Sequence, residues 1–349
     1  MKKISLYKKL IIFFIVSFKL ILYIIQKTIT MNSLINKLFL IFIIILSLPY
    51  ILKLRFNKES FIKIVLFFLL ATYLFLINND DNIFLFSLLG LLLIDNDNKD
   101  IIKTIFISLT IGFVFTLILG KVGILYNNKL IRSTDGVLQN RYSLGFSNPN
   151  AVFAYFIPII ISGAYLYKNN ILFILIFLIS AIILYYYTKC RTGFYIIIII
   201  LIFSLLKLRI GKKGNIFFPV FSILSILLAI LFGKTHYNII NQALSYRPWF
   251  SYQFLSKGFS AWGKGIPEDL IIDNFYLRIL AFYSIIGFLV YYYIYYKGSL
   301  KCKNDYLLIH SLFFFLLYNV FEAMTIGNFV LIIFLKEIFI SYGVYYEKN

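Results

Sequence analysis

The sequence predicts an all-α, polytopic integral membrane protein with about 12 transmembrane helices (11–12), on three observations. Hydrophobic residues make up 61% of the chain and charged residues 14%, and the mean hydropathy is +0.90. Soluble domains carry about 25% charged residues, so a soluble core is excluded. The cations lie in short clusters between long apolar runs, and no internal repeat or soluble domain is evident. Residues 1–349 are therefore predicted to form a single integral membrane domain.

Twelve apolar stretches are the candidate spans. The first follows the basic N-terminus and covers about residues 10–25. No small-residue cleavage site follows it, which favours a retained span over a signal peptide. The fourth holds only about a dozen apolar residues, so it either tilts or re-enters, and this leaves the count between 11 and 12. The remaining stretches lie at about 34–52, 61–77, 83–94, 101–119, 151–167, 171–187, 194–206, 216–232, 274–296, 306–321 and 326–342.

Charge asymmetry between the loops predicts the orientation. With both termini in the cytoplasm, the basic loops at 53–63, 207–213 and 297–303 all fall inside, as the positive-inside bias requires. The acidic turn NNDDN then falls outside, together with the turn TKCRTG and the long polar intervals 120–150 and 233–273. Every motif-like segment is thus expected on the external face.

The distribution of charge, the number of cysteines and the missing catalytic motifs argue against several functional classes, although the net charge is +20. Nucleic-acid binding needs a basic face on a soluble domain, which this chain lacks. Cys190 and Cys302 are too few for a disulfide framework or a zinc site. The sequence has no GxxxxGKS, HExxH or CxxC motif, so nucleotide hydrolysis and zinc chemistry have no support. We therefore predict no cofactor and no metal.

The interval 233–273 is predicted to be one large external loop and the working surface of the protein. It holds both Trp residues and one of the two His. Loops of about forty residues are uncommon unless functional or disordered, and this aromatic composition argues against disorder. Apolar residues recur at helical spacing from Trp249 to Leu255, which predicts a short helix on the membrane surface. Pro248 suits its first position, and Arg247 would stand at its N-terminus, near the positive end of the helix dipole.

Two further arginines precede apolar spans on the same predicted face. Arg141 is followed by LGFSNPN, where Pro149 biases its predecessor away from helix. We expect Asn150 to cap the next span and Arg141 to form an anion site beside it; the alternative is a turn with a helix cap. Arg191 lies in TKCRTG near the membrane boundary, where an arginine needs a partner or a ligand; the alternative is headgroup snorkelling.

Acid–base candidates are few. Glu322, near the outer end of a span, is a functional-site hypothesis by default, or else it pairs with a structural arginine. Asp273 either acts in the site or caps the span that begins at 274. His236 lies at the start of the large loop, where a lone histidine more often has a structural than a catalytic role. Glu268 and Asp269 lie near the loop's end.

Arginine forks match phosphate bidentately, so a lipid-linked diphosphate is the natural ligand of such a cluster. Three segments carry a family resemblance: NRYSLGFSNPNA, TKCRTGF, and the loop R-x10-G followed by IDNFYLRILAFYSIIG. Together they resemble the O-antigen and capsular-polysaccharide polymerase (Wzy-type) superfamily, which also contains the O-antigen ligases. The resemblance covers about residues 132–287 and the span count.

The resemblance implies a polysaccharide polymerase of the bacterial cytoplasmic membrane. Such an enzyme transfers a growing glycan from undecaprenyl diphosphate to a lipid-diphosphate-linked repeat unit, by metal-independent inverting glycosyl transfer on the outer face. Arg191 and Arg247 would be catalytic, stabilising the departing diphosphate. Membrane lipid is an implied partner, and so are a chain-length regulator and a flippase. The implied substrate-binding residues are Arg141, Asn150, Gly258, Arg278, Asp273, Trp249 and Glu322.

Three alternatives stay open. In the ligase branch a loop histidine typically follows the loop arginine, whereas His236 precedes Arg247 here, which favours the polymerase. A lipid-linked oligosaccharide flippase or other transporter tends to show internal repeats and midplane charges. A structural membrane protein would not need clustered external arginines.

Overall fold

Helices account for most of the regular structure in the computed structural model, which describes residues 4–18, 34–78, 82–134, 137–168, 170–208, 210–211, 213–235, 241, 244, 246–258, 272–322 and 328–346. These residues form α1 Leu6–Phe13, continued by a π-helix Phe14–Phe18, then α3 Leu34–Ile51, α4 Lys58–Asn78, α5 Asn82–Leu92, α6 Asn98–Val122, α7 Pro149–Leu166, α8 Ile171–Thr188, α9 Arg191–Leu205, a 3-10 turn Gly214–Ile216, α10 Phe217–Phe232, α12 Arg247–Lys257, α13 Phe275–Lys301, α14 Tyr306–Asn319 and α15 Phe329–Ser341.

The helical membrane-protein class predicted from the apolar stretches is consistent with these elements. Within the described ranges, every α-helix except α12 overlaps one of the twelve stretches. Six are long and apolar enough to cross a membrane by length and composition, namely 58–76, 98–122, 149–166, 171–188, 214–232 and 275–301. Shorter apolar helices include α3, α5, α9 and α14. The count of 11–12 spans and the side on which the termini lie stay predictions.

Burial separates central from peripheral helices. α7 is mostly buried and packs against α6, α8, α9 and α14. In α4, α8 and α10 less than a third of the residues are buried, and many apolar side chains are exposed, as expected where lipid replaces water as the neighbour. Every residue of α5 except Phe84 is buried, and the helix packs against α15. The short fourth stretch is thus enclosed by protein.

The predicted span 274–296 corresponds to a helix with a break inside it. Ser284 in α13 has φ 67° and ψ −174°, which is not helical. Its hydroxyl accepts a hydrogen bond from the backbone N–H of Ile286 at 3.2 Å, and this restarts the second segment. The left-handed φ is costly for a serine, so the surrounding packing must hold it.

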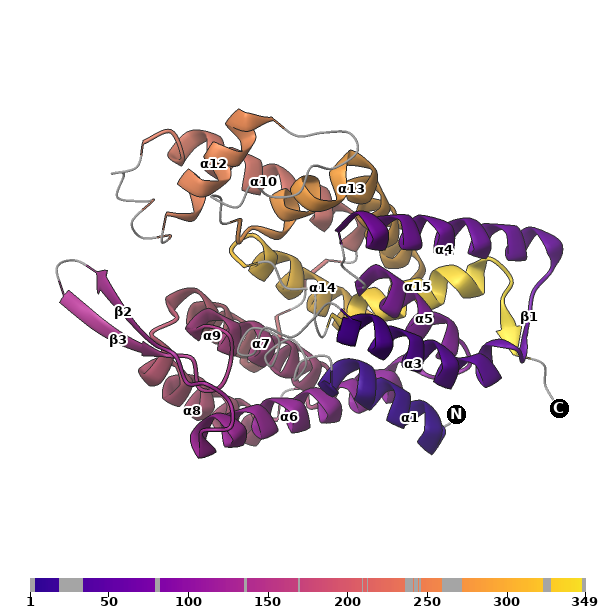
Figure 1. The fold of residues 1–349 in the computed structure, drawn as a ribbon, viewed down its shortest axis with the longest axis horizontal. Helices are drawn as coiled ribbons and strands as arrows, with labels where there is room; N and C mark the ends of the chain where they lie inside the picture. The colour runs from indigo at the N-terminus through magenta and orange to yellow at the C-terminus, as the bar shows by residue number, and fades with distance from the viewer. Residues whose placement is uncertain are drawn as a thin grey trace.

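Two small antiparallel sheets qualify the all-α prediction. β2 Lys129–Thr134 pairs with β3 Val137–Tyr142, inside an interval that we had predicted only to be polar. β1 Leu54–Arg55 pairs with β4 Tyr345–Tyr346. The β2–β3 hairpin and α12 lie toward one end of the molecule, whereas β1 and both chain ends lie toward the other (Figure 1). The two ends of the bundle are therefore built from different loops.

Long-range polar contacts join segments that lie at the same end of the bundle. Lys8 Nζ lies 2.6 Å from Asp95 Oδ1, and the Tyr165 hydroxyl lies 2.8 Å from Asp305 Oδ2; all four lie at the end predicted to be cytoplasmic. At the opposite end Arg141 contacts the carbonyl of Thr188. These contacts join segments that the loop charges assign to the same face.

Candidate functional site

Arg247 is the centre of the largest buried ion-pair cluster among the described residues. Its Nη2 pairs with Glu322 Oε1, its Nε lies 3.4 Å from Asp273 Oδ2, and its Nη1 donates to Thr192 Oγ1 at 3.3 Å. Arg247 is only 9% exposed and Glu322 8%. The four residues come from α12, the turn after α14, the segment before α13, and the first turn of α9. Four chain segments thus converge on one guanidinium.

The start of α12 is fixed by backbone geometry and by a buried asparagine. Tyr246 adopts a left-handed conformation (φ 62°), and α12 begins at Arg247, so Pro248 is the second helical residue, one position later than predicted but still in the first turn. Asn241 is fully buried, and its Nδ2 donates to the carbonyls of Phe232 and Thr235 at 2.5 and 2.7 Å. Its Oδ1 accepts from the Trp249 backbone N–H at 3.1 Å. Asn241 therefore ties the N-terminus of α12 to the end of α10.

Gly233 permits close contact between these two helices. A Cβ at this position would lie 2.4 Å from the Pro248 carbonyl oxygen and 2.4 Å from the Tyr252 Cβ. The backbone atoms cannot yield as a flexible side chain would, so any larger residue would push α12 away from α10. The position of Arg247 depends on this contact, because Arg247 is the first residue of α12.

Arg141 belongs to a second, adjoining group. It is 9% exposed, its Nε donates to the Thr188 carbonyl at 2.8 Å, and its Nη2 donates to Asn150 Oδ1 at 2.7 Å. The prediction that Asn150 caps the next helix is wrong. Asn148 is the N-cap, extended at φ −160°, and its side chain accepts from Ala151 N. Because Pro149 fixes where the helix starts, the cap lies one residue before it, and Asn150 is left to bind Arg141.

The turn between α8 and α9 links the two arginines. Its first residue, Thr188, accepts from Arg141, and Thr192, four residues on, accepts from Arg247. Between them Arg191 is exposed at the first position of α9, and among the described residues no hydrogen bond or ion pair to its side chain is found. The structure thus brings the segment of Arg191 to Arg247 but leaves the Arg191 side chain outside the ion-pair cluster.

Burial governs the ionisation of the groups around Arg247. Burial raises the pKa of Glu322 to about 7, although Arg247 and, more weakly, Arg141 favour the carboxylate. For Arg247 burial lowers the pKa, but Glu322 and Asp273 outweigh it, so the pKa is raised overall and the guanidinium stays charged. Burial raises the pKa of Cys190 to about 11. The Cys190 thiol is therefore protonated at neutral pH and is no candidate nucleophile.

The two predicted roles for the acidic residues are now distinguished. Glu322 pairs with an arginine, which was the alternative to an independent functional carboxylate. Asp273 does not cap α13, because Asn274 is the N-cap and its side chain accepts from Leu277 N at 3.1 Å. Asp273 is free of that role and lies beside Arg247, with its side chain 35% exposed.

Three other predicted residues lie on α12 or α13. Gly258 ends α12 with φ 72°, a conformation that favours glycine, and is exposed. Trp249 is half-buried and its ring contacts that of Phe250. Arg278 is exposed, with its guanidinium 5.1 Å from the centre of the Phe282 ring on the same helix. No contact of Arg278 with Arg247 is found, so the structure does not bring it into the cluster.

Three predicted residues cannot be placed, and some residues that contact the arginines were not predicted. His236, Glu268 and Asp269 lie outside the described residues. Sequence reasoning missed Asn241 and Thr192, because an isolated amide or hydroxyl carries no signal of its contacts. It also missed the β2–β3 hairpin, for which the Asp-Gly pair at 135–136 between two alternating runs was an available signal.

Comparison with protein-family models, with curated proteins and with solved structures finds no match to this chain. Among the described residues, no group of three or more His, Cys, Asp or Glu is arranged to hold a metal ion. The chemistry that the site offers is that of two buried arginines and two carboxylates, beside one exposed arginine.

Proposed function

We propose that this protein is a membrane glycosyltransferase: a polysaccharide polymerase that moves a growing glycan from undecaprenyl diphosphate to a lipid-diphosphate-linked repeat unit. The proposal places it in the bacterial cytoplasmic membrane with about 12 spans, both termini in the cytoplasm and the large loop outside. The observation that carries it is the convergence of Arg247, Arg141 and the segment of Arg191 at one end of the bundle.

A diphosphate group would bind by exchanging partners with Arg247. A buried guanidinium held by carboxylates is charged and oriented before any ligand arrives, so its reorganisation cost is small. The phosphate oxygens would replace Glu322 or Asp273 on one edge of the Arg247 guanidinium. The exposed Arg191 would then contact the diphosphate from the opposite side. Arginine suits this role because its planar fork can hold a carboxylate and a phosphate at once.

The reaction needs one bond made and one broken. The acceptor hydroxyl oxygen attacks the anomeric carbon of the donor sugar, and the bond between that carbon and the diphosphate oxygen breaks. The electron pair leaves on undecaprenyl diphosphate, where the arginines stabilise it. The acceptor proton must pass to a base. Glu322, which pairs with Arg247 and whose pKa burial raises to about 7 in that pair, is our candidate for this base.

Turnover in the absence of metals and nucleotides tests the reaction. Purified protein in lipid vesicles should extend lipid-diphosphate-linked repeat units into a ladder of products with EDTA present and no nucleotide added. The arginine cluster supplies the charge stabilisation that a divalent ion would otherwise provide. Strict dependence on a divalent ion would overturn this account.

The orientation of the loops is tested separately. Reporter fusions after Lys213 and Lys301 should be cytoplasmic, and fusions at Asn128 and Gly258 should be external, because the basic loops are retained inside. An external signal at Lys213 would place the arginine cluster on the wrong face for a lipid-linked donor exported to the outer leaflet.

A further inference from the structure

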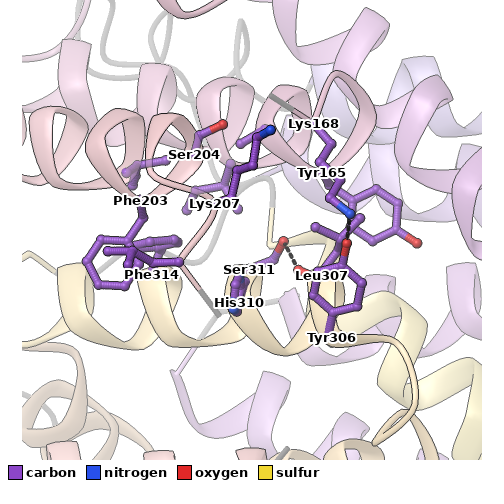
Figure 2. Close-up of a pocket in the computed structure, with 14 residues that line it drawn as sticks. Tyr165, Lys168, Phe203, Ser204, Lys207, Tyr306, Leu307, His310, Ser311 and Phe314 are labelled. Carbon is purple, nitrogen blue, oxygen red and sulfur yellow. Dashed lines mark hydrogen bonds between the residues drawn. The ribbon is translucent and has the colours of Figure 1, made fainter. Parts of the chain in front are cut away.

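A cavity lies between α7, α9 and α14. Its volume is about 150 Å³, and fourteen residues from these three helices and from the segments after α7 and α9 line it. Figure 2 shows Lys168 reaching the hydroxyl of Tyr306 on the α14 side, while Lys207 lies beside Ser204 on the α9 side. Phe203 and Phe314 form an apolar wall. The cavity is thus basic at its rim and apolar behind it.

The position of this cavity separates it from the Arg247 cluster. Thr192 and Arg191 stand at the start of α9, whereas Phe203 and Ser204 stand near its end. Likewise Asn150 is the second residue of α7, and Tyr165 and Lys168 lie near and just beyond the end of that helix. At about 1.5 Å per residue, fifteen residues of α7 span roughly 22 Å. The cavity and the arginine cluster therefore lie at opposite ends of the same helices.

The charges around the cavity favour an anion. Lys168 and Lys207 are both exposed and line it, and the Lys168 amino group lies 4.7 Å from the centre of the Tyr306 ring. Asp305, which precedes the lining residue Tyr306 in the chain, does not line the cavity. Its carboxylate accepts from the Tyr165 hydroxyl at 2.8 Å and from the Leu308 backbone N–H at 3.1 Å. Two cations thus face the cavity, while the neighbouring carboxylate is held by its own partners.

We propose that this cavity binds a phosphate group, and that its source is the headgroup of an anionic phospholipid. Basic pockets between transmembrane helices on the cytoplasmic side are suited to such headgroups. The apolar wall would contact the part of the acyl chain nearest the headgroup. Leu205, Leu206 and Leu208 are exposed next to the cavity and continue an apolar surface along which the acyl chain can lie. The site is independent of the glycosyl-transfer proposal, since it shares no lining residue with the Arg247 cluster.

Binding of short-chain phosphatidylglycerol to the purified full-length protein tests the site, with short-chain phosphatidylcholine and inorganic phosphate as the other two arms. We expect phosphatidylglycerol to bind saturably and phosphatidylcholine not to bind. The Lys168→Ala/Lys207→Ala variant should bind phosphatidylglycerol at least tenfold more weakly. The Lys301→Ala/Lys303→Ala variant, which removes the same charge from two exposed positions at and after the end of α13, should bind like wild type. Inorganic phosphate binding as tightly as phosphatidylglycerol would assign the cavity to a soluble phosphate instead.

A conservative variant keeps the test decisive if the alanine variant unfolds. Lys168→Arg/Lys207→Arg retains both charges and should retain binding, and size-exclusion elution reports whether each variant is folded. Equal phosphatidylglycerol affinity in folded wild-type and double-alanine protein would overturn the proposal. So would the absence of binding by both phosphatidylglycerol and inorganic phosphate.

Discussion

Two buried cations, Lys336 and Arg247, have contrasting surroundings. Lys336 on α15 is 4% exposed, and its ammonium donates to the Asn96 carbonyl and to Asn98 Oδ1, both at 2.7 Å, with Glu337 Oε1 at 3.3 Å. All three donors of this ammonium therefore have an oxygen within reach. Arg247 has two carboxylates, yet its buried Nε has no hydrogen-bond partner among the described residues and lies 3.4 Å from Asp273.

The difference separates a structural cation from a candidate ligand-binding one. Lys336 is saturated by neutral oxygens and one acid from nearby segments, so a ligand could reach it only by dismantling the packing of α15. Arg247 is held by two acids, and in the proposed reaction a phosphate takes the place of one of them; the exposed Arg191 precedes Thr192, whose hydroxyl contacts Arg247. A buried charge alone is weak evidence for function; the Nε, unsatisfied within the described part of the chain, and the neighbouring exposed arginine are what distinguish Arg247.

The largest effect should come from replacing the arginines of the proposed active site. Arg247→Lys and Arg191→Lys should each lower the polymerisation rate by about 10²–10³, the cost of removing one charge-stabilising donor from a preorganised site. Lysine keeps the positive charge beside Glu322 but offers no fork. The measurement is the ladder of polymer lengths in cells lacking the native gene, with the amount of each protein in the membrane quantified.

The double variant sharpens this result. Residues that act on one leaving group are not additive, so Arg191→Lys/Arg247→Lys should be scarcely worse than either single variant. Lys234→Ala is the matched control, because an exposed cation near the loop rim is screened by salt. Near-normal ladders from both single lysine variants would return the two arginines to a structural or headgroup-binding role.

A smaller effect, of a different kind, is expected at Lys336. Lys336→Met should lower the free energy of unfolding by about 1–3 kcal/mol, because it leaves the buried oxygens of Asn96 and Asn98 without their donor. Polymer made per folded molecule should stay at the wild-type level. Thermal unfolding in detergent and the polymer ladder together check this. A variant that remains fully folded but makes no polymer would contradict the contrast drawn between the two cations.

The last prediction concerns the pH dependence of stability. Burial raises the pKa of Glu322 from 4.5 to about 7, so between these values the folded protein holds a proton that the unfolded chain releases. Stability should therefore fall as the pH rises from about 4.5 to about 7. Glu322→Gln should flatten this decline in melting experiments.

A second glutamate substitution provides the control for that measurement. Glu337→Gln, next to Lys336, should leave the decline caused by Glu322 in place. A Glu322→Gln variant that keeps the full wild-type slope would show that another group titrates in this range, and it would remove the support for Glu322 as the base.

Local sequence information was sufficient for the helices. The apolar stretches at 34–52, 171–187 and 216–232 match α3, α8 and α10 to within a few residues at each end, because in a membrane each stretch must satisfy its backbone hydrogen bonds internally. The short helix at Trp249, with Pro248 in its first turn, was also predictable, because proline fixes the backbone there. The sequence by itself thus determined the helical class and the start of α12.

Only the tertiary structure decided which side chains meet. Glu322 lies 75 positions after Arg247 and Thr192 lies 55 before it, and no local pattern reports a pairing over such separations. The same holds for Asn150, where spacing suggested a cap, but the start of α7 at Pro149 gave that role to Asn148 and left Asn150 to Arg141. Helix formation depends on hydrogen bonds between near neighbours in the chain. The partner of a buried charge depends on how helices pack, and that is set by the whole bundle.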